Sequence, residues 1–317
     1  MIRRWKIATA ASVLLLLLFS VSYLLLGDKN YALTDIFTNP IILHLRLPRL
    51  AAVLLTGALL SASGFLVQLM TKNPIAEMTT LGISGGASLA LAVLLVLGGA
   101  SGGFLAMGSA TFGAFVALVC VLVFTAKTHF QPLKVVLVGT SIGLFATSLA
   151  GALTFYTHNT QAYFYWIVGS FAGVTLLKLE MLTYVALIFL GVTLIFATRF
   201  RALEMGDEMA RGLGVNVALT RLVIMALVAL TSGVSVASVG VIAFVGLIAP
   251  HIARNFSSSA HFWRTLILSA LTGMNLLILA DLLARNLMKP YEFPAGSLTM
   301  LIGAPFFISL MSRKERK

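Results

Sequence analysis

The chain has 317 residues, of which 59% are hydrophobic and 10% are charged, and its mean hydropathy is +1.02. A soluble domain is usually nearer half apolar and a quarter charged, so this composition excludes a soluble fold and requires the bilayer as solvent. The net charge of +12 indicates contact with acidic membrane lipid, and we expect no nucleic-acid partner.

Ten apolar runs separated by polar breaks predict an all-α polytopic membrane protein with about ten transmembrane helices, since a span needs roughly 20 residues. We expect a single transmembrane domain over residues 1–317, with an uncleaved first span in place of a signal peptide. The segment 158–178 is aromatic and predicts a short broken helix at the outer face, and the link at residues 238–241 is very tight. The runs cover residues 7–26, 47–70, 83–99, 105–126, 134–156, 179–198, 220–237, 241–256, 263–285 and 295–312.

The distribution of basic residues predicts the orientation. With the N-terminus in the cytoplasm, sixteen of the 22 Lys and Arg residues fall on the inner side, as the positive-inside rule requires. We therefore expect both termini in the cytoplasm. Glycines at residues 82–86 and 98–103 predict close backbone approach between helices.

Three arginines break this trend because they fall on the outer side. Arg46 and Arg49 begin the second span, and Arg285 ends the ninth. They are typical either of snorkelling at the interface or of docking an acidic partner from outside. Asp281 is the one acid set back from the ends of a predicted span and lies four residues before Arg285, which predicts a local ion pair that positions Arg285. A single such acid argues against an ion-coupled transporter.

The loop at residues 199–221 is the longest and most polar inner segment. It carries Glu204, Asp207, Glu208 and Arg211, and a glycine pair follows that can end a helix. This pattern predicts either a short amphipathic helix that fits a groove in a soluble partner, or a solvated loop.

A third segment, residues 240–254, contains Pro250 near the inner end of a span, where proline bends or ends a helix. His251 beside it is expected to hydrogen-bond the freed backbone. The G-x-S-G pattern of an intramembrane serine protease also appears, at residues 82–85 and 99–102, but a serine nucleophile needs a base and few histidines are placed to serve. The chain lacks the Walker A pattern, so ATP hydrolysis would need a separate polypeptide.

Nine segments, in order from about residue 40 to 312, together resemble the FecCD-type permeases, the membrane subunits of type II bacterial ABC importers for ferric siderophores, haem and cobalamin. The chain departs from the family pattern at Ile75, where leucine is usual, and at Met78-Thr79, where proline is frequent. Neither departure falls on the positions implied below for docking the binding protein or coupling to the ATPase. The segments are R-L-P-R at 46–49, 57–68, Asn73-Pro74-Ile75-Ala76, 81–87, 206–214, 244–251, 280–285, Glu292-Phe293-Pro294-Ala295-Gly296 and 303–307.

The resemblance implies a multi-pass permease of the bacterial cytoplasmic (inner) membrane that is not itself an enzyme. Its expected partners are a second permease, identical or related, two cytoplasmic ATPase subunits that bind ATP and Mg, and an extracytoplasmic substrate-binding protein. No cofactor, metal site or catalytic residue is expected in this chain. A ferric siderophore is the first expected ligand, with haem or cobalamin as alternatives.

The resemblance also implies roles for individual residues. Arg46, Arg49 and Arg285 would receive acidic residues of the binding protein. The residues that couple the permease to the ATPase would be Glu204, Gly206, Asp207, Glu208, Ala210, Arg211, Leu213 and Gly214.

The translocation path, where the ligand would be contacted, would include Thr154, Tyr156, Tyr163, Tyr165 and Trp166. These candidates for ligand contact are equally typical of an interfacial aromatic belt. The remaining motif positions are Gln68, Asn73, Pro74, Pro250, His251, Asp281, Glu292 and Pro294.

Overall fold

The structure is a computed structural model that describes residues 2–27, 29–99, 103–126, 132–257, 261–289 and 291–314. These residues form helices, turns and extended links, and no strand occurs among them. The α-helices are α1 (Ile2–Leu25), α2 (Leu47–Thr71), α3 (Ile83–Val96), α4 (Gly103–Ala126), α5 (Pro132–Tyr156), α6 (Thr160–Val168), α7 (Leu176–Glu204), α8 (Asp207–Gly212), α9 (Val217–Val239), α10 (Val245–Phe256), α11 (Phe262–Asn286) and α12 (Ala295–Lys314).

Each of the ten predicted spans corresponds to one of these helices, and the predicted all-α polytopic fold is confirmed. Seven helices in the described part of the chain are long and apolar enough to cross a membrane, and α3 and α12 provide shorter apolar stretches. A short π-helical segment, η2 (Ile42–Arg46), leads directly into α2, so that the first of the three arginines lies inside a continuous helical segment.

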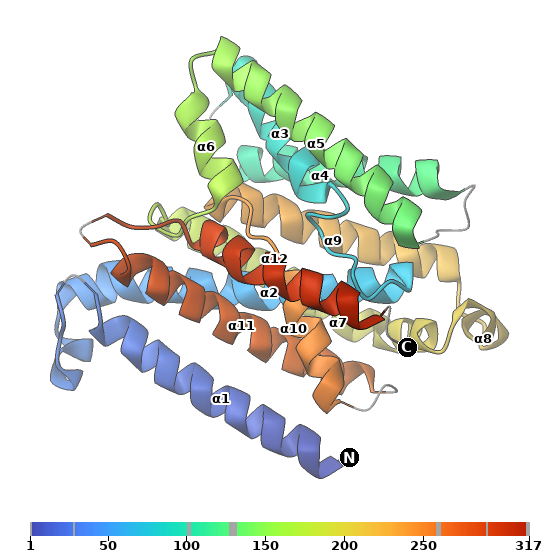
Figure 1. Cartoon of the computed structure of the whole chain (residues 1–317), viewed down its shortest axis with the longest axis horizontal. Coiled ribbons are helices and arrows are strands. Elements are labelled where there is room, and N and C mark those ends of the chain that lie inside the picture. The colour runs from blue at the N-terminus through green and yellow to red at the C-terminus, as the bar shows by residue number, and fades with distance from the viewer. Residues whose placement is uncertain are drawn as a thin grey trace.

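The two ends of the bundle carry different parts of the chain. Figure 1 shows both chain ends at the same end of the bundle as α8, while the loop after α1 and the loop between α11 and α12 lie at the opposite end. The predicted cytoplasmic location of both chain ends stays a prediction. Lys127, Arg316 and Lys317, which contribute to the predicted charge bias, lie outside the described residues, as do Ser101 and Gly102.

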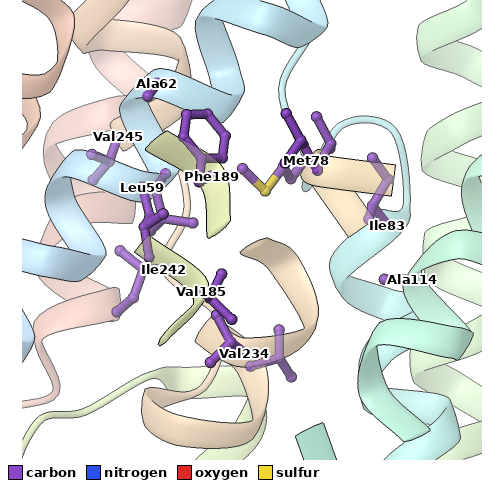
Figure 2. Packing of buried hydrophobic residues seen from close by; sticks show 14 of the residues in the cluster. Leu59, Ala62, Met78, Ile83, Ala114, Val185, Phe189, Val234, Ile242 and Val245 are labelled. Atoms are coloured by element: carbon purple, nitrogen blue, oxygen red, sulfur yellow. The ribbon is translucent and has the colours of Figure 1, made fainter. Parts of the chain in front are cut away.

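The core lies around α2, whose side chains are buried along most of its length. Figure 2 shows Leu59 and Ala62 of α2 near Phe189 of α7 and Val245 of α10, with Met78 entering the core from the link between α2 and α3. All of these side chains are buried, so the segment after α2 is part of the interior.

Glycine allows two of these helices to touch. A Cβ atom at Gly64 would lie 2.1 Å from the carbonyl oxygen of Gly246, so α2 and α10 meet backbone to backbone. A Cβ at Gly86 would likewise lie 2.4 Å from the oxygen of Gly113, which confirms the predicted close approach at residues 82–86. The same prediction was wrong at Gly98, because this glycine follows the end of α3 and a Cβ there would have no described atom within 4 Å.

The helix predicted from residue 241 begins four residues later. Residues 240–244 are not helical because Gly240 has a φ of +79° and the N–H of Val241 donates to the carbonyl of Trp166, 2.7 Å away. The backbone of α6 thus holds this link extended, and α10 has 12 residues, or about 18 Å. The predicted short helix within 158–178 is confirmed as α6.

Candidate functional site

The three outward arginines converge on one cavity at the end of the bundle opposite α8. The cavity has a volume of about 420 Å³ and is lined by Arg46, Arg49, Arg285, Lys29 and Glu292 together with neutral residues and His44. Four of its described lining residues are therefore permanent cations and one is an acid. Such a concentration of positive charge attracts an anionic group.

Arg49 is held by two carboxylates. Its Nε and Nη2 donate to Asp281 at 3.0 and 2.9 Å, and its Nη1 donates to both oxygens of Glu292 at 2.9 and 2.8 Å. The side chain of Asp281 is 1% exposed and that of Glu292 is 39% exposed. Tyr23 of α1 also donates its hydroxyl to Asp281. This set, Tyr23, Arg49, Asp281 and Glu292, is called the Arg49 clamp below; it joins α1, α2, α11 and the link before α12.

The predicted ion pair between Asp281 and Arg285 was wrong. Asp281 pairs instead with Arg49, which comes from another helix and offers two parallel N–H groups to the carboxylate. Arg285 turns toward α1, where its Nη1 donates to the carbonyl of Tyr23 at 3.4 Å and its guanidinium lies 4.7 Å from the Tyr23 ring centre. Packing of α11 on α2 therefore overrides the pairing along one helix.

Arg46 and Arg285 both bind the end of α1. The Nη1 of Arg46 donates to the carbonyl of Leu24 at 2.6 Å, and its Nη2 donates to the carbonyl of Lys29 at 2.7 Å. The last carbonyls of a helix lack partners within the helix and carry partial negative charge, so cations there are favourable. A Cβ at Gly27 would lie 2.5 Å from one guanidinium and 2.9 Å from the other, so glycine leaves room for both. The arginines thus have a structural role whether or not a partner docks.

The predicted inner amphipathic helix is present as α8. Asp207 at its start pairs with Arg221 of α9 at 2.8 Å and with Lys72, just after α2, at 3.1 Å. Partial burial would raise the pKa of Asp207, but the hydrogen bond from Lys72 and the charge of Arg221 outweigh it and hold the pKa below its usual value. Asp207 therefore stays ionised and ties α8 to two spanning helices.

One face of the α8 region is apolar and exposed. Met205, which ends α7, Met209 within α8 and Leu213, which ends α8, are 67%, 57% and 61% exposed. Ala210 faces the opposite way and is buried, while Glu208 and Arg211 are exposed. Gly206 and Gly214 have φ of +106° and +77° and begin and end the turn. Large apolar side chains exposed together indicate a surface that a partner covers.

The ligand-contact candidates fall in different surroundings. Thr154 and Trp166 are buried, and Tyr156 is 82% exposed at the end of α5. The hydroxyl of Tyr163 donates to the carbonyl of Thr147 at 2.7 Å, and the hydroxyl of Tyr165 lies 3.2 Å from the backbone carbonyl oxygens of both Ser170 and Ser238. Contact between these five residues and a ligand stays a prediction.

A second cavity was not anticipated from the sequence. It has a volume of about 390 Å³ between α3, α5 and the link before α10, and its lining includes Thr79, Ser84, Thr140 and Thr147. Glu77, which the sequence left unassigned, is buried behind Thr79, and its burial raises its pKa to about 7 although the N–H groups of Phe244 and Thr79 hydrogen-bond to it. The Asn-Pro pair just before Glu77 was the available signal, because it marks a turn.

The remaining motif positions join neighbouring segments. Gln68 donates to the carbonyl of Gly246 at 3.2 Å and accepts from Arg254 at 2.5 Å, which links α2 to α10. The side-chain oxygen of Asn73 accepts from the N–H of Ile75 and forms the turn that contains Pro74, and Pro294 immediately precedes α12.

Pro250 lies inside α10. His251 does not bond the freed backbone among the described residues; its ring meets that of Phe306 edge-on at 5.7 Å.

Known proteins resemble this chain over nearly its whole length. It is 37% identical to the Fe(3+)-citrate import system permease protein YfmD of Bacillus subtilis (strain 168) over 280 residues, which cover 87% of this chain and 82% of that protein. It is 34% identical to the iron(3+)-hydroxamate import system permease protein FhuB of the same organism over 281 residues, 88% of this chain and 73% of the relative.

A solved structure of a metal-chelate-type ABC transporter in an inward-facing conformation has the same fold. Its TM-score is 0.81 at 27% sequence identity, and the match covers 97% of this chain and 99% of that chain. The model of the FecCD transport family matches residues 13–313. The chain belongs to the FecCD transport family.

Proposed function

We propose that this chain is the permease subunit of an ATP-binding-cassette importer that moves a ferric siderophore from an extracytoplasmic binding protein into the bacterial cytoplasm. Family membership supports the permease role, and the iron-chelate import systems named for two relatives support an iron chelate as the ligand. The seven long apolar helices are consistent with a multi-pass protein of the inner membrane.

The observation that carries the proposal is that two surfaces of different chemistry lie at opposite ends of the bundle, one near the loop after α1 and one at α8; Figure 1 shows that loop and α8 at opposite ends. The cavity lined by Arg46, Arg49 and Arg285 is positive and suits acidic side chains of a binding protein. The α8 region exposes Met209 and Leu213 and suits a groove in an ATPase subunit. Both termini and α8 are then cytoplasmic.

In the proposed mechanism, the ion pairs of Asp207 connect α8 to two spanning helices. ATP closes the two ATPase subunits, and their movement displaces α8. Because Asp207 holds both Lys72 at the end of α2 and Arg221 on α9, a displacement of α8 is transmitted to two central helices. Two permease subunits, identical or related, then rock between outward and inward states around the ligand path. ATP and Mg are held by the ATPase subunits.

Haem and cobalamin stay as alternative ligands of the same type of importer. The intramembrane protease alternative has little support, because the cavity beside Ser84 has no histidine among its described lining residues, and a serine nucleophile needs a base within hydrogen-bond reach.

The test of the proposed function is uptake by cells with and without this gene under iron limitation. Radio-iron siderophores, haem and cobalamin are offered in parallel, and we expect loss of uptake of one ferric siderophore only. Loss of haem or cobalamin uptake would reassign the ligand, and unchanged uptake of every compound would contradict the proposal once a second permease gene had been deleted as a control for redundancy.

A further inference from the structure

A groove between α1 and α10–α11 opens at the end of the bundle that carries the N-terminus. It has a volume of about 490 Å³, within the range of roughly 300–1,000 Å³ found for small-molecule sites. Most of its lining is apolar or small, and Leu268 of α11 forms its buried floor. Figure 1 shows α1 at the edge of the bundle beside α11, so the groove faces the surroundings of the protein.

The wall formed by α1 combines a cation with a narrow apolar furrow. Arg4, Ala8, Ala11, Ser12 and Leu15 all line the groove, and their spacing places them on a single face of the helix. From Arg4 to Leu15 the furrow is roughly 16 Å long at the helical rise. One leaflet of the hydrocarbon core is roughly 15 Å thick, so the furrow matches the depth of one acyl chain.

Near the groove, two hydrogen bonds hold α1 against α11. Trp5 donates its indole N–H to the carbonyl of Arg264 at 3.4 Å, and the Arg264 guanidinium lies 5.4 Å from the Trp5 ring centre. About two helical turns farther along α1, the Asn275 side chain donates to the carbonyl of Ser12 at 3.0 Å. The groove therefore persists as a fixed feature of the helix packing, with an aromatic residue at the level where tryptophan favours the membrane interface.

The groove carries a positive charge, on Arg4, at the end where a lipid headgroup would lie. Arg4 is exposed and makes no ion pair within the part of the chain that the structure describes, and the polar side chain of Asn255 lies on the facing wall. Basic pockets between membrane helices bind anionic lipid headgroups. We propose that this groove is a binding site for one anionic phospholipid, with its phosphate at Arg4 and an acyl chain along Ala8, Ala11 and Leu15.

The proposal is tested on the purified permease by native mass spectrometry, with phosphatidylglycerol and phosphatidylcholine of identical acyl chains added in turn. We expect the wild type to retain one phosphatidylglycerol per chain. Arg4→Gln should weaken that retention about fivefold, the effect of roughly 1 kcal/mol per basic residue near the lipid surface, and leave phosphatidylcholine unaffected. Arg4 is exposed, so this substitution leaves folding intact.

Two further variants make the test specific. Arg199→Gln removes an exposed arginine at the end of α7, outside the groove, and should retain phosphatidylglycerol as the wild type does. Ala11→Phe fills the furrow without changing charge and should weaken retention of both lipids. Equal retention by the Arg4 and Arg199 variants, or unchanged retention by Ala11→Phe, would overturn the proposal.

Discussion

Replacing Arg49 by glutamine is expected to lower the free energy of unfolding by about 3–5 kcal/mol, the usual cost of removing one partner from a buried ion pair. Asp281 is 1% exposed, so without Arg49 its charge would stay buried and uncompensated. The measurement is the thermal unfolding midpoint of the purified protein in detergent, together with the amount of folded protein recovered from membranes.

Two controls separate this effect from a general loss of positive charge. The double variant Arg49→Gln with Asp281→Asn removes both charges and should recover much of the loss, because no buried ion is left. Glu292→Gln alone should cost no more than about 1 kcal/mol, since this carboxylate is 39% exposed and pairs near the surface. If the Arg49 variant unfolds like the wild type, or the double variant is as unstable as the single one, the Arg49 clamp does not stabilise the fold.

The Arg49 clamp also changes how docking must be tested. Charge reversal at all three arginines would place another carboxylate beside Asp281 and would remove the cations that bind the end of α1. Loss of uptake by such a variant would then follow from misfolding. Lys29 lines the same cavity and has an exposed side chain, so Lys29→Glu tests the electrostatic attraction of a binding protein with less risk to the fold.

Replacing Met209 by aspartate is expected to abolish stable association with the ATPase subunits and hence uptake. Met209 is 57% exposed at the centre of an apolar face, and truncating or charging a central interface residue typically costs about 2 kcal/mol or more, roughly 30-fold in affinity. Because the side chain contributes little to the interior, the permease itself should fold normally. The measurement is co-purification of the ATPase with the tagged permease.

Met209→Leu is the matched control, because it keeps the apolar character and nearly the volume of the side chain. It should bind the ATPase as the wild type does. Normal recovery of the ATPase with the aspartate variant, at wild-type permease levels, would show that this face of α8 is not the ATPase contact.

The sequence predicted the helices better than it predicted their partners. Hydropathy located each spanning helix, because a span is defined by its own residues. The contact of Arg49 with Asp281 joins residues 232 positions apart, and the rule for pairs four residues apart considers only one helix. The α10 start was misplaced for a similar reason, because the backbone of α6 holds Val241 extended.

The candidate site was predictable in part. Arg46, Arg49 and Arg285 stood out because they oppose the charge bias, and the structure brings them to one cavity. Burial was not predictable, so the binding of Arg46 and Arg285 to the end of α1 appears only in the structure. Met205, Met209 and Leu213 are visible in the sequence, but apolar residues near a helix usually face a core, and only the structure shows that these three are exposed.

We propose that this chain moves its ligand across the membrane with energy supplied by a separate ATPase. The most direct test is reconstitution of the permease in proteoliposomes with the ATPase subunits and the binding protein that co-purify with it, followed by radio-iron siderophore import. We predict import that requires ATP, the ATPase and the binding protein, and that persists when an uncoupler dissipates the proton gradient. Import without the ATPase that collapses with the uncoupler would contradict the account and indicate an ion-coupled transporter.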